Sequence, residues 1–304
     1  MNNRDLARFG ASVTLSAMVT AGFPWVPVLL GWMLTAGIYG RFSPGTRPDM
    51  GREAPLVLLG ALPVTAAILL GADGAFPEET TFPFVSLALL AVLLAAISSR
   101  RDSMVRVAGV LGALLLGILG TVAAFGLMDV RWERNVPELP AASQVCLSAA
   151  AGIPWWSGAE NRRSNSWLAG AAAVSLCMSL VTRGVLGGAL ADWEGAPLYR
   201  AVQTVRILGV LQRLEALLAA SVLMGAMILL LLTAEAALEA GEKLLGRSPG
   251  MGARIGFLFF TFLLEWGFRV LPEAYAGLVK TVFWGLLLTL TLGIVGCGKF
   301  AKKA

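Results

Sequence analysis

The sequence predicts an all-α integral membrane protein, and three observations lead to that class. Of its 304 residues, 57% are hydrophobic and only 14% are charged, whereas a soluble domain carries about 25% charged residues. The mean hydropathy is +0.75. Uncharged apolar runs recur along the chain, each near the roughly 18 residues needed to cross a bilayer. Because these runs are apolar on every face, we expect helical spans rather than alternating strands.

About ten spans account for the apolar runs within one transmembrane domain, residues 1–304. The first run, 9–40, is too long for one comfortable span and contains Gly22, Pro24 and Pro27, so it is divided in two. A single tilted helix over this run, which would give nine spans, is the alternative. The predicted spans are 8–23, 25–41, 54–72, 82–98, 107–128, 140–157, 166–190, 208–238, 253–271 and 274–297.

The basic residues favour an orientation with the N- and C-termini in the cytoplasm. With the N-terminus inside, the inner segments contain Arg4, Arg8, Arg41, Arg47, Arg52, Arg100, Arg101, Arg106, Arg162, Arg163, Lys243, Arg247, Arg254, Lys299, Lys302 and Lys303. The loop after the third span, ADGAFPEETT, is acidic. Cytoplasmic loops are enriched in Lys and Arg. The net charge of +5 therefore indicates membrane orientation and not nucleic-acid binding.

The spans divide into two halves of five, 1–135 and 136–304, that begin with similar helices. The first helix of one half ends in AGFPW, and that of the other ends in AGIPWW. Because five is odd, the halves have opposite orientations. This pattern predicts a 5+5 inverted repeat of the LeuT or APC type, with a discontinuous first helix in each half.

The two breaks are the predicted ligand site, between spans 1, 3, 6 and 8. Unwound backbone offers free N–H and C=O groups for a carboxylate or an ammonium. The predicted residues are Gly22, Phe23, Pro24, Gly152, Pro154, Trp155 and Trp156. One of the two Trp side chains would supply an apolar wall. The alternative is a simple interfacial cap, because Trp anchors at the headgroup level.

Charged residues flank the apolar stretch 216–234 of the eighth span. Arg213 and Glu215 lie at its start and Glu235 at its end. Ionisable groups near the membrane require a partner or a water-filled path, so these three predict a polar node at the mouth of a pathway. Snorkelling of the side chains at the interface is the alternative.

Two further spacings predict contacts between helices or turns. Glu265 and Arg269 lie four residues apart with Glu first, which predicts an internal ion pair. In the fifth span, small residues recur every four positions at Gly109, Ala113 and Gly117 and continue to Thr121. Such spacing predicts a ridge that packs closely against another helix.

Enzymatic, metal-binding and cofactor-binding functions are not expected. The chain has no histidine, which removes the commonest metal ligand and proton shuttle. The absence of histidine also excludes a Ser-His-Asp arrangement. Its three cysteines, Cys146, Cys177 and Cys297, are scattered and have no metal-ligand spacing. No phosphate-binding loop or zinc-protease motif is present.

Two stretches resemble one known family. Residues 197–238 contain Gln212-Arg213-Leu214-Glu215-Ala216-Leu217 followed by a long apolar helix, and residues 81–140 contain an Arg before a helix and an acidic segment ending in Leu-Pro. Both resemble the B-subunit family of bacterial spore germinant receptors, ten-span proteins of the amino acid–polyamine–organocation superfamily. Here AGFPW replaces the family's polar stretch entering span 2.

The resemblance implies a permease-like nutrient receptor subunit in a spore inner membrane or a bacterial cytoplasmic membrane. It would bind a small molecule such as an amino acid and act with other receptor subunits in a heteromeric membrane complex. Two alternatives stay open: a secondary active transporter for amino acids or polyamines, and a membrane scaffold of a sporulation assembly that binds no ligand.

Overall fold

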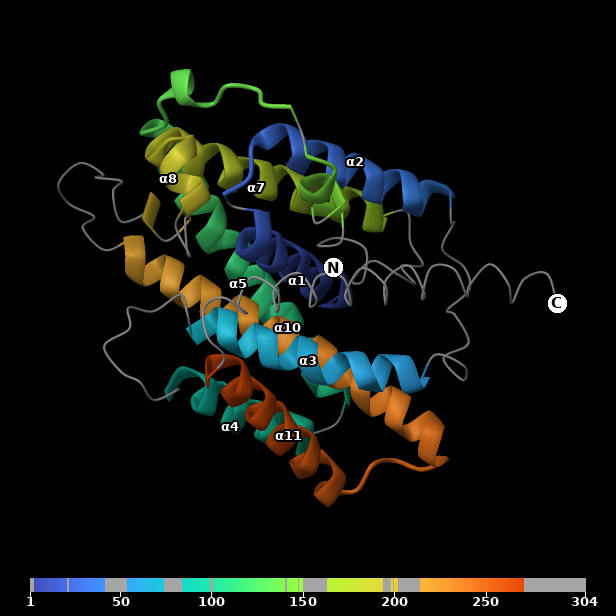
Figure 1. Ribbon diagram of the computed structural model, residues 1–304. Helices are drawn as coiled ribbons and strands as arrows, with labels where there is room; N and C mark the ends of the chain where they lie inside the picture. Colours follow the sequence, from blue (N-terminus) through green and yellow to red (C-terminus); the bar gives the residue numbers. More distant parts are fainter. Residues whose placement is uncertain are drawn as a thin grey trace.

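The computed structural model (Figure 1) describes residues 3–20, 22–41, 54–73, 84–98, 101–139, 141–146, 148–149, 163–193, 198, 200–201 and 214–270. The regular structure in these residues is entirely helical, without strands, so the predicted all-α class is confirmed for them. Three helical segments among them, Ser103–Met128, Trp167–Leu186 and Ala219–Leu245, are long and apolar enough to cross a membrane. This is consistent with a membrane protein.

The helices follow the predicted spans closely. Their bounds are α1 Asn3–Thr20, α2 Trp25–Arg41, α3 Ala54–Asp73, α4 Phe84–Ser98, α5 Arg101–Met128, η1 Trp132–Arg134, α7 Arg163–Leu186, α8 Gly188–Trp193, α10 Leu214–Leu245 and α11 Met251–Val270. The predicted span 274–297 lies outside the described residues, and the predicted span 140–157 is described only as far as 149.

The chain breaks between α1 and α2, so the alternative of a single helix over 9–40 is wrong. Helix α1 ends at Thr20 and α2 begins at Trp25. Proline restricts both its own backbone and the residue before it, which explains why the helix does not continue through Pro24. Pro27 is tolerated in the first turn of α2 because N–H groups there have no partner within the helix.

Helix α1 packs against α5 in the same direction through glycines. A Cβ at Gly109 would collide with Asn3, and a Cβ at Gly112 would collide with the carbonyl oxygen of Leu6. Both positions advance together along the two helices, so the pair is parallel. In lipid, burying apolar surface brings little gain, and close backbone approach at small residues drives helix association instead.

The predicted ridge of small residues on α5 is wrong, because most of its positions do not face a neighbouring helix. Gly109 is buried against α1, but Ala113, Gly117 and Thr121 are exposed, and a Cβ at Gly117 would meet nothing within 4 Å. Steps of four residues overshoot each helical turn by about 40°, so a strict four-residue stripe rotates away from its neighbour. The buried face instead continues from Gly112, at positions spaced three and four apart.

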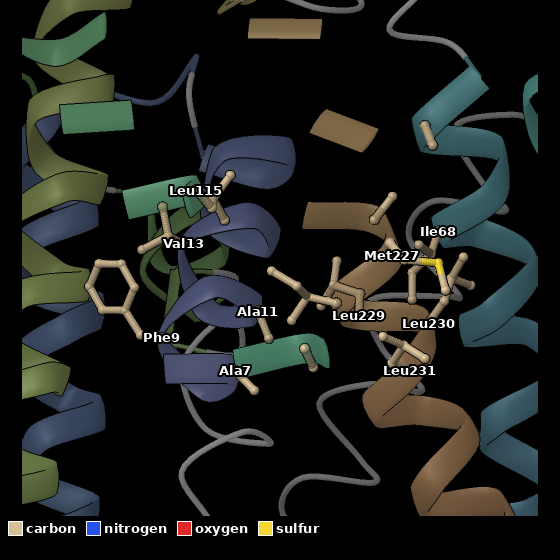
Figure 2. Packing of buried hydrophobic residues seen from close by; sticks show 14 of the residues in the cluster. Ala7, Phe9, Ala11, Val13, Ile68, Leu115, Met227, Leu229, Leu230 and Leu231 are labelled. Atoms are coloured by element: carbon tan, nitrogen blue, oxygen red, sulfur yellow. The ribbon is translucent and has the colours of Figure 1, made fainter. Parts of the chain in front are cut away.

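Helix α10 runs through the centre of the described helices and antiparallel to α1. A Cβ at Gly225 would collide with Thr14, whereas Ile228 lies against Gly10. The residues from Ile228 to Leu231 are all fully buried. Figure 2 shows Leu229 on the side of α10 that faces α1, with Met227 and Leu230 toward Ile68 of α3. The core therefore lies on both sides of α10.

Helices α3, α4 and α11 form a second group beside α10 (Figure 1). Helix α4 is antiparallel to α11: Ser98 approaches Met251 at one end, and Ser86 bonds Glu265 at the other. Arg254 donates to the carbonyl oxygen of Ile97 in the last turn of α4. A cation is favourable there because the last carbonyls of a helix lack partners and carry partial negative charge.

Candidate functional site

The break at Gly22–Pro24 lies beside the C-terminal end of α7. Helix α1 runs parallel to α7. Near the start of both helices, the ring of Phe9 packs edge-on against Trp167 with centroids 5.8 Å apart, and Gly22, just after α1, lies beside Arg183 near the end of α7. The hydroxyl of Ser179 donates to the carbonyl oxygen of Phe23 at 2.7 Å. The Nε of Arg183 donates to the carbonyl oxygen of Gly22 at 3.0 Å. Two carbonyls freed by the break are thus bonded by α7 side chains.

Arg183 is a buried charge within the apolar segment Trp167–Leu186. Only 3% of the surface of Arg183 is exposed. Its Nη1 forms an ion pair of 2.6 Å with Oε1 of Glu138, whose side chain is 52% exposed. A guanidinium in a low-dielectric environment requires such a partner, because removing it from water costs several kcal/mol. The pair joins the break to a residue in the loop that follows α5.

Residues 129–139, which we call the strap, cover the end of α7. The backbone N–H of Arg131 donates to the carbonyl oxygen of Gly184 at 3.2 Å. Arg134 donates to the carbonyl oxygen of Val185 at 2.6 Å, and Asn135 donates to that of Leu180 at 3.2 Å. The last carbonyls of a helix have no partner within it. The strap supplies donors to two of them.

Glycine at position 184 permits this close approach. A Cβ there would lie 2.5 Å from a methyl of Val130 and 2.8 Å from the amide nitrogen of Asn135. The carbonyl-type oxygen Oδ1 of Asn135 is buried and has no hydrogen-bond partner among the described residues. We call the break together with Ser179, Arg183 and the strap the polar junction.

The predicted break residues Gly22, Phe23 and Pro24 form the link between two helices, and not an interruption within one helix. Their first two carbonyls are engaged by α7. The other four predicted residues of the ligand site, Gly152, Pro154, Trp155 and Trp156, lie outside the described residues. The pairing of the two breaks stays a prediction.

The predicted polar node is described only in part. Arg213 lies outside the described residues, and Glu215 lies on α10 at a position whose side chain is not described. Glu235 is half-buried on the same helix and has an interaction partner. Glu215 and Glu235 are twenty residues apart on α10, which is about 30 Å, so they cannot belong to one binding site within that helix.

Glu265 and Arg269 form an ion pair, as their spacing predicts. Nη2 and Nε of Arg269 lie 2.8 Å and 3.1 Å from Oε1 of Glu265. The hydroxyl of Ser86 on α4 donates to the same oxygen at 2.6 Å. Glu265 is fully buried, and within the described part of the chain its second oxygen, Oε2, has no hydrogen-bond partner.

Sequence reasoning missed the residues of the polar junction other than the break. Arg183 is the only charged residue in the predicted span 166–190, and an ionisable residue within a span is by itself a signal of a site. Ser179 and Glu138 carry no comparable signal, because their importance depends on what they contact.

Within the described residues, no three His, Cys, Asp or Glu side chains gather where they could hold a metal ion. Neither a protein-family model nor a curated protein matches this chain.

Proposed function

We propose that this chain is a permease-like receptor subunit of a bacterial membrane that binds a small nutrient molecule, as its resemblance to germinant receptor B-subunits implies. The observation that supports the proposal best is the α1–α2 break beside a buried arginine. The break carbonyls of Gly22 and Phe23 are held by Arg183 and Ser179. An ionisable side chain within a membrane-spanning segment is costly and is by default a sign of a functional site.

The helix directions also support the proposal. In the described residues, α1 and α7 run in the same direction and end together, and α10 runs opposite to α1. These directions fit the alternation of consecutive spans in a ten-span permease with both termini in the cytoplasm. In that arrangement the polar junction faces away from the cytoplasm, where a nutrient would arrive.

Deleting the gene in its source organism and following germination of purified spores on a nutrient panel tests the proposal. We expect the loss of response to at least one nutrient. Complementation with the wild type or with Gly117→Ala, an exposed position with open space around it, should restore that response. Replacing Gly22, Phe23 and Pro24 together by Ala should not. An unchanged response to every nutrient after deletion contradicts the proposal.

A secondary active transporter for amino acids or polyamines is the second candidate. The observation in its favour is Glu265, a buried carboxylate with one unpaired oxygen, since ion-coupled transport uses such groups. Uptake by proteoliposomes under a proton or sodium gradient tests it, with Glu265→Gln as the variant. Gradient-driven uptake that the variant loses would support transport, and absence of any flux would count against it.

A ligand-free scaffold is distinguished by the second break. Replacing Gly152, Pro154 and Trp155 together by Ala should leave a scaffold functional and should disable a receptor that binds its ligand there.

A further inference from the structure

Two hydroxyl groups reach a carbonyl oxygen in the opposite predicted half of the chain. The hydroxyl of Ser179 on α7 donates to the carbonyl oxygen of Phe23 at 2.7 Å. The hydroxyl of Thr35 on α2 lies 3.1 Å from the carbonyl oxygen of Ala149 and 3.0 Å from that of Gly31 in its own helix, so its single proton is within reach of both. Each half therefore provides a hydroxyl that contacts the other half.

The segment that contains Ala149 crosses α2 closely at a glycine. Residues 142–146 and 148–149 of this segment are helical. A Cβ at Gly31 would collide with the side chain of Ser148 and would lie 2.8 Å from the carbonyl oxygen of Val145. Thr35 follows Gly31 by about one helical turn, so the contact extends over a full turn of α2. Close approach at small residues is what holds helices together in lipid.

Prolines in the sequence predict that both carbonyls need a donor from another helix. In an α-helix each carbonyl accepts a hydrogen bond from the N–H four residues later. For Phe23 that residue is Pro27, which has no N–H. For Ala149 it is Ile153, whose helical conformation is disfavoured by the proline that follows it. A buried carbonyl without a donor is unfavourable, and a hydroxyl from a neighbouring helix supplies one.

We propose that Thr35 and Ser179 are matched positioning residues, through which each half of the chain fixes the end of the first helix of the other half. Helix α2 packs against α7 (Figure 1), so the two hydroxyls belong to one contact between the halves. An inverted repeat predicts this reciprocity. The two-fold axis that relates the halves turns the contact of α7 with the end of α1 into a contact of α2 with the first helix of the second half.

The consequence of this arrangement for nutrient sensing rests on the proposed receptor function. Ala149 lies three residues before Gly152, so Thr35 fixes the point from which the predicted ligand-site residues of the second half follow. Ser179 fixes Phe23, which is itself a predicted ligand-site residue of the first half. Loss of either hydrogen bond should therefore weaken the response to a nutrient, although neither hydroxyl has to touch the ligand.

Hydrogen–deuterium exchange of the full-length protein in nanodiscs tests the arrangement itself. Thr35→Val keeps the shape of the side chain and removes its hydroxyl, so the amides of residues 142–149 should exchange about fivefold faster. Thr35→Ser keeps the hydroxyl and should exchange as the wild type does. Thr65→Val is the matched control, because Thr65 is equally buried and bonds the carbonyl oxygen of Ala61 in its own helix; it should leave residues 142–149 unchanged.

Unchanged exchange of residues 142–149 in Thr35→Val, or an equal increase in every helix, would overturn the inference and leave the receptor proposal standing. Germination on the nutrient panel tests the consequence: Thr35→Val and Ser179→Ala should each need about fivefold more nutrient, and Thr35→Ser should respond normally. A normal response of Thr35→Val despite faster local exchange would overturn its positioning role. Faster local exchange in a protein whose deletion changes no response would overturn the receptor proposal and leave the reciprocal contact standing.

Discussion

Among the residues that the structure describes, two buried ion pairs are built in opposite ways. In the Glu265–Arg269 pair the carboxylate is fully buried and the side chain of the arginine is 21% exposed. In the Glu138–Arg183 pair the arginine is buried and the side chain of the glutamate is 52% exposed. The first pair joins adjacent turns of one helix, whereas the second joins a helix to a strap 45 residues away in sequence.

In the first pair the carboxylate is shielded from water, whereas in the second pair the carboxylate is accessible to it. Arg269 is tied to its partner by two bonds within α11, and Ser86 of α4 bonds the same carboxylate. Glu138 lies at the surface and forms its ion pair with Arg183 through one oxygen, Oε1. We therefore expect the first pair to hold α4 against α11 and to contribute more to stability than the second. Four sets of variants test this distinction.

Arg269→Met should destabilise the protein most, by about 3 to 5 kcal/mol, because it leaves the fully buried Glu265 carboxylate without its cation. Equilibrium unfolding in mixed detergent micelles measures the loss. The double variant Glu265→Leu with Arg269→Met should recover most of it, since two apolar residues leave no buried charge. A double variant as unstable as the single one would mean that the buried charge is not the cause.

Arg183→Met should cost less, about 1 to 3 kcal/mol, because the Glu138 left behind is half-exposed and can be hydrated, while the Gly22 carbonyl loses a donor. The same unfolding measurement applies. Arg131→Met is the control, because Arg131 bonds α7 through its backbone N–H and should change stability little. A loss larger than that of Arg269→Met would reverse the comparison.

The two serines that serve these regions should differ by about a factor of two. Ser86→Ala removes a hydrogen bond to a buried carboxylate and should cost about 2 kcal/mol, whereas Ser179→Ala removes one to the neutral Phe23 carbonyl and should cost about 1 kcal/mol. Matched unfolding curves of the two variants measure this. If both variants lost the same stability, the hydrogen bond from Ser86 to the charged carboxylate of Glu265 would be no stronger than the bond from Ser179 to a neutral carbonyl.

Glu138→Gln should have the smallest effect on stability, below about 1 kcal/mol, because the amide oxygen of Gln can still accept a hydrogen bond from Arg183 and the half-exposed charge that is lost is screened by water and salt. Raising the ionic strength should reduce the difference from the wild type further. Unfolding at low and high salt, with Glu133→Gln as the control, measures both. A loss of several kcal/mol would mean that the negative charge of Glu138, and not only its hydrogen-bond acceptor, is needed to hold the buried Arg183.

The local features of this protein can be predicted from its sequence. Hydropathy over about 20 residues gave the helices from α1 to α5 and α11 within a few residues of their bounds, because a span is set by its own apolar length. The break at Gly22–Pro24 followed from proline and glycine within one run. The Glu265–Arg269 pair followed from helical spacing alone, since both residues lie on one helix.

Which helices pack together, and which polar groups from distant parts of the chain come into contact, is seen only in the folded protein. The α5 face that meets α1 starts from Gly109 and Gly112 and leaves Gly117 exposed, because a helix repeats every 3.6 residues and the position of its neighbour selects the face. Arg183 could be singled out from the sequence as a charge in a span, but its partners could not. Gly22 and Glu138 reach it from distant parts of the chain, and no local pattern encodes a contact that depends on how α1, α5 and α7 end side by side.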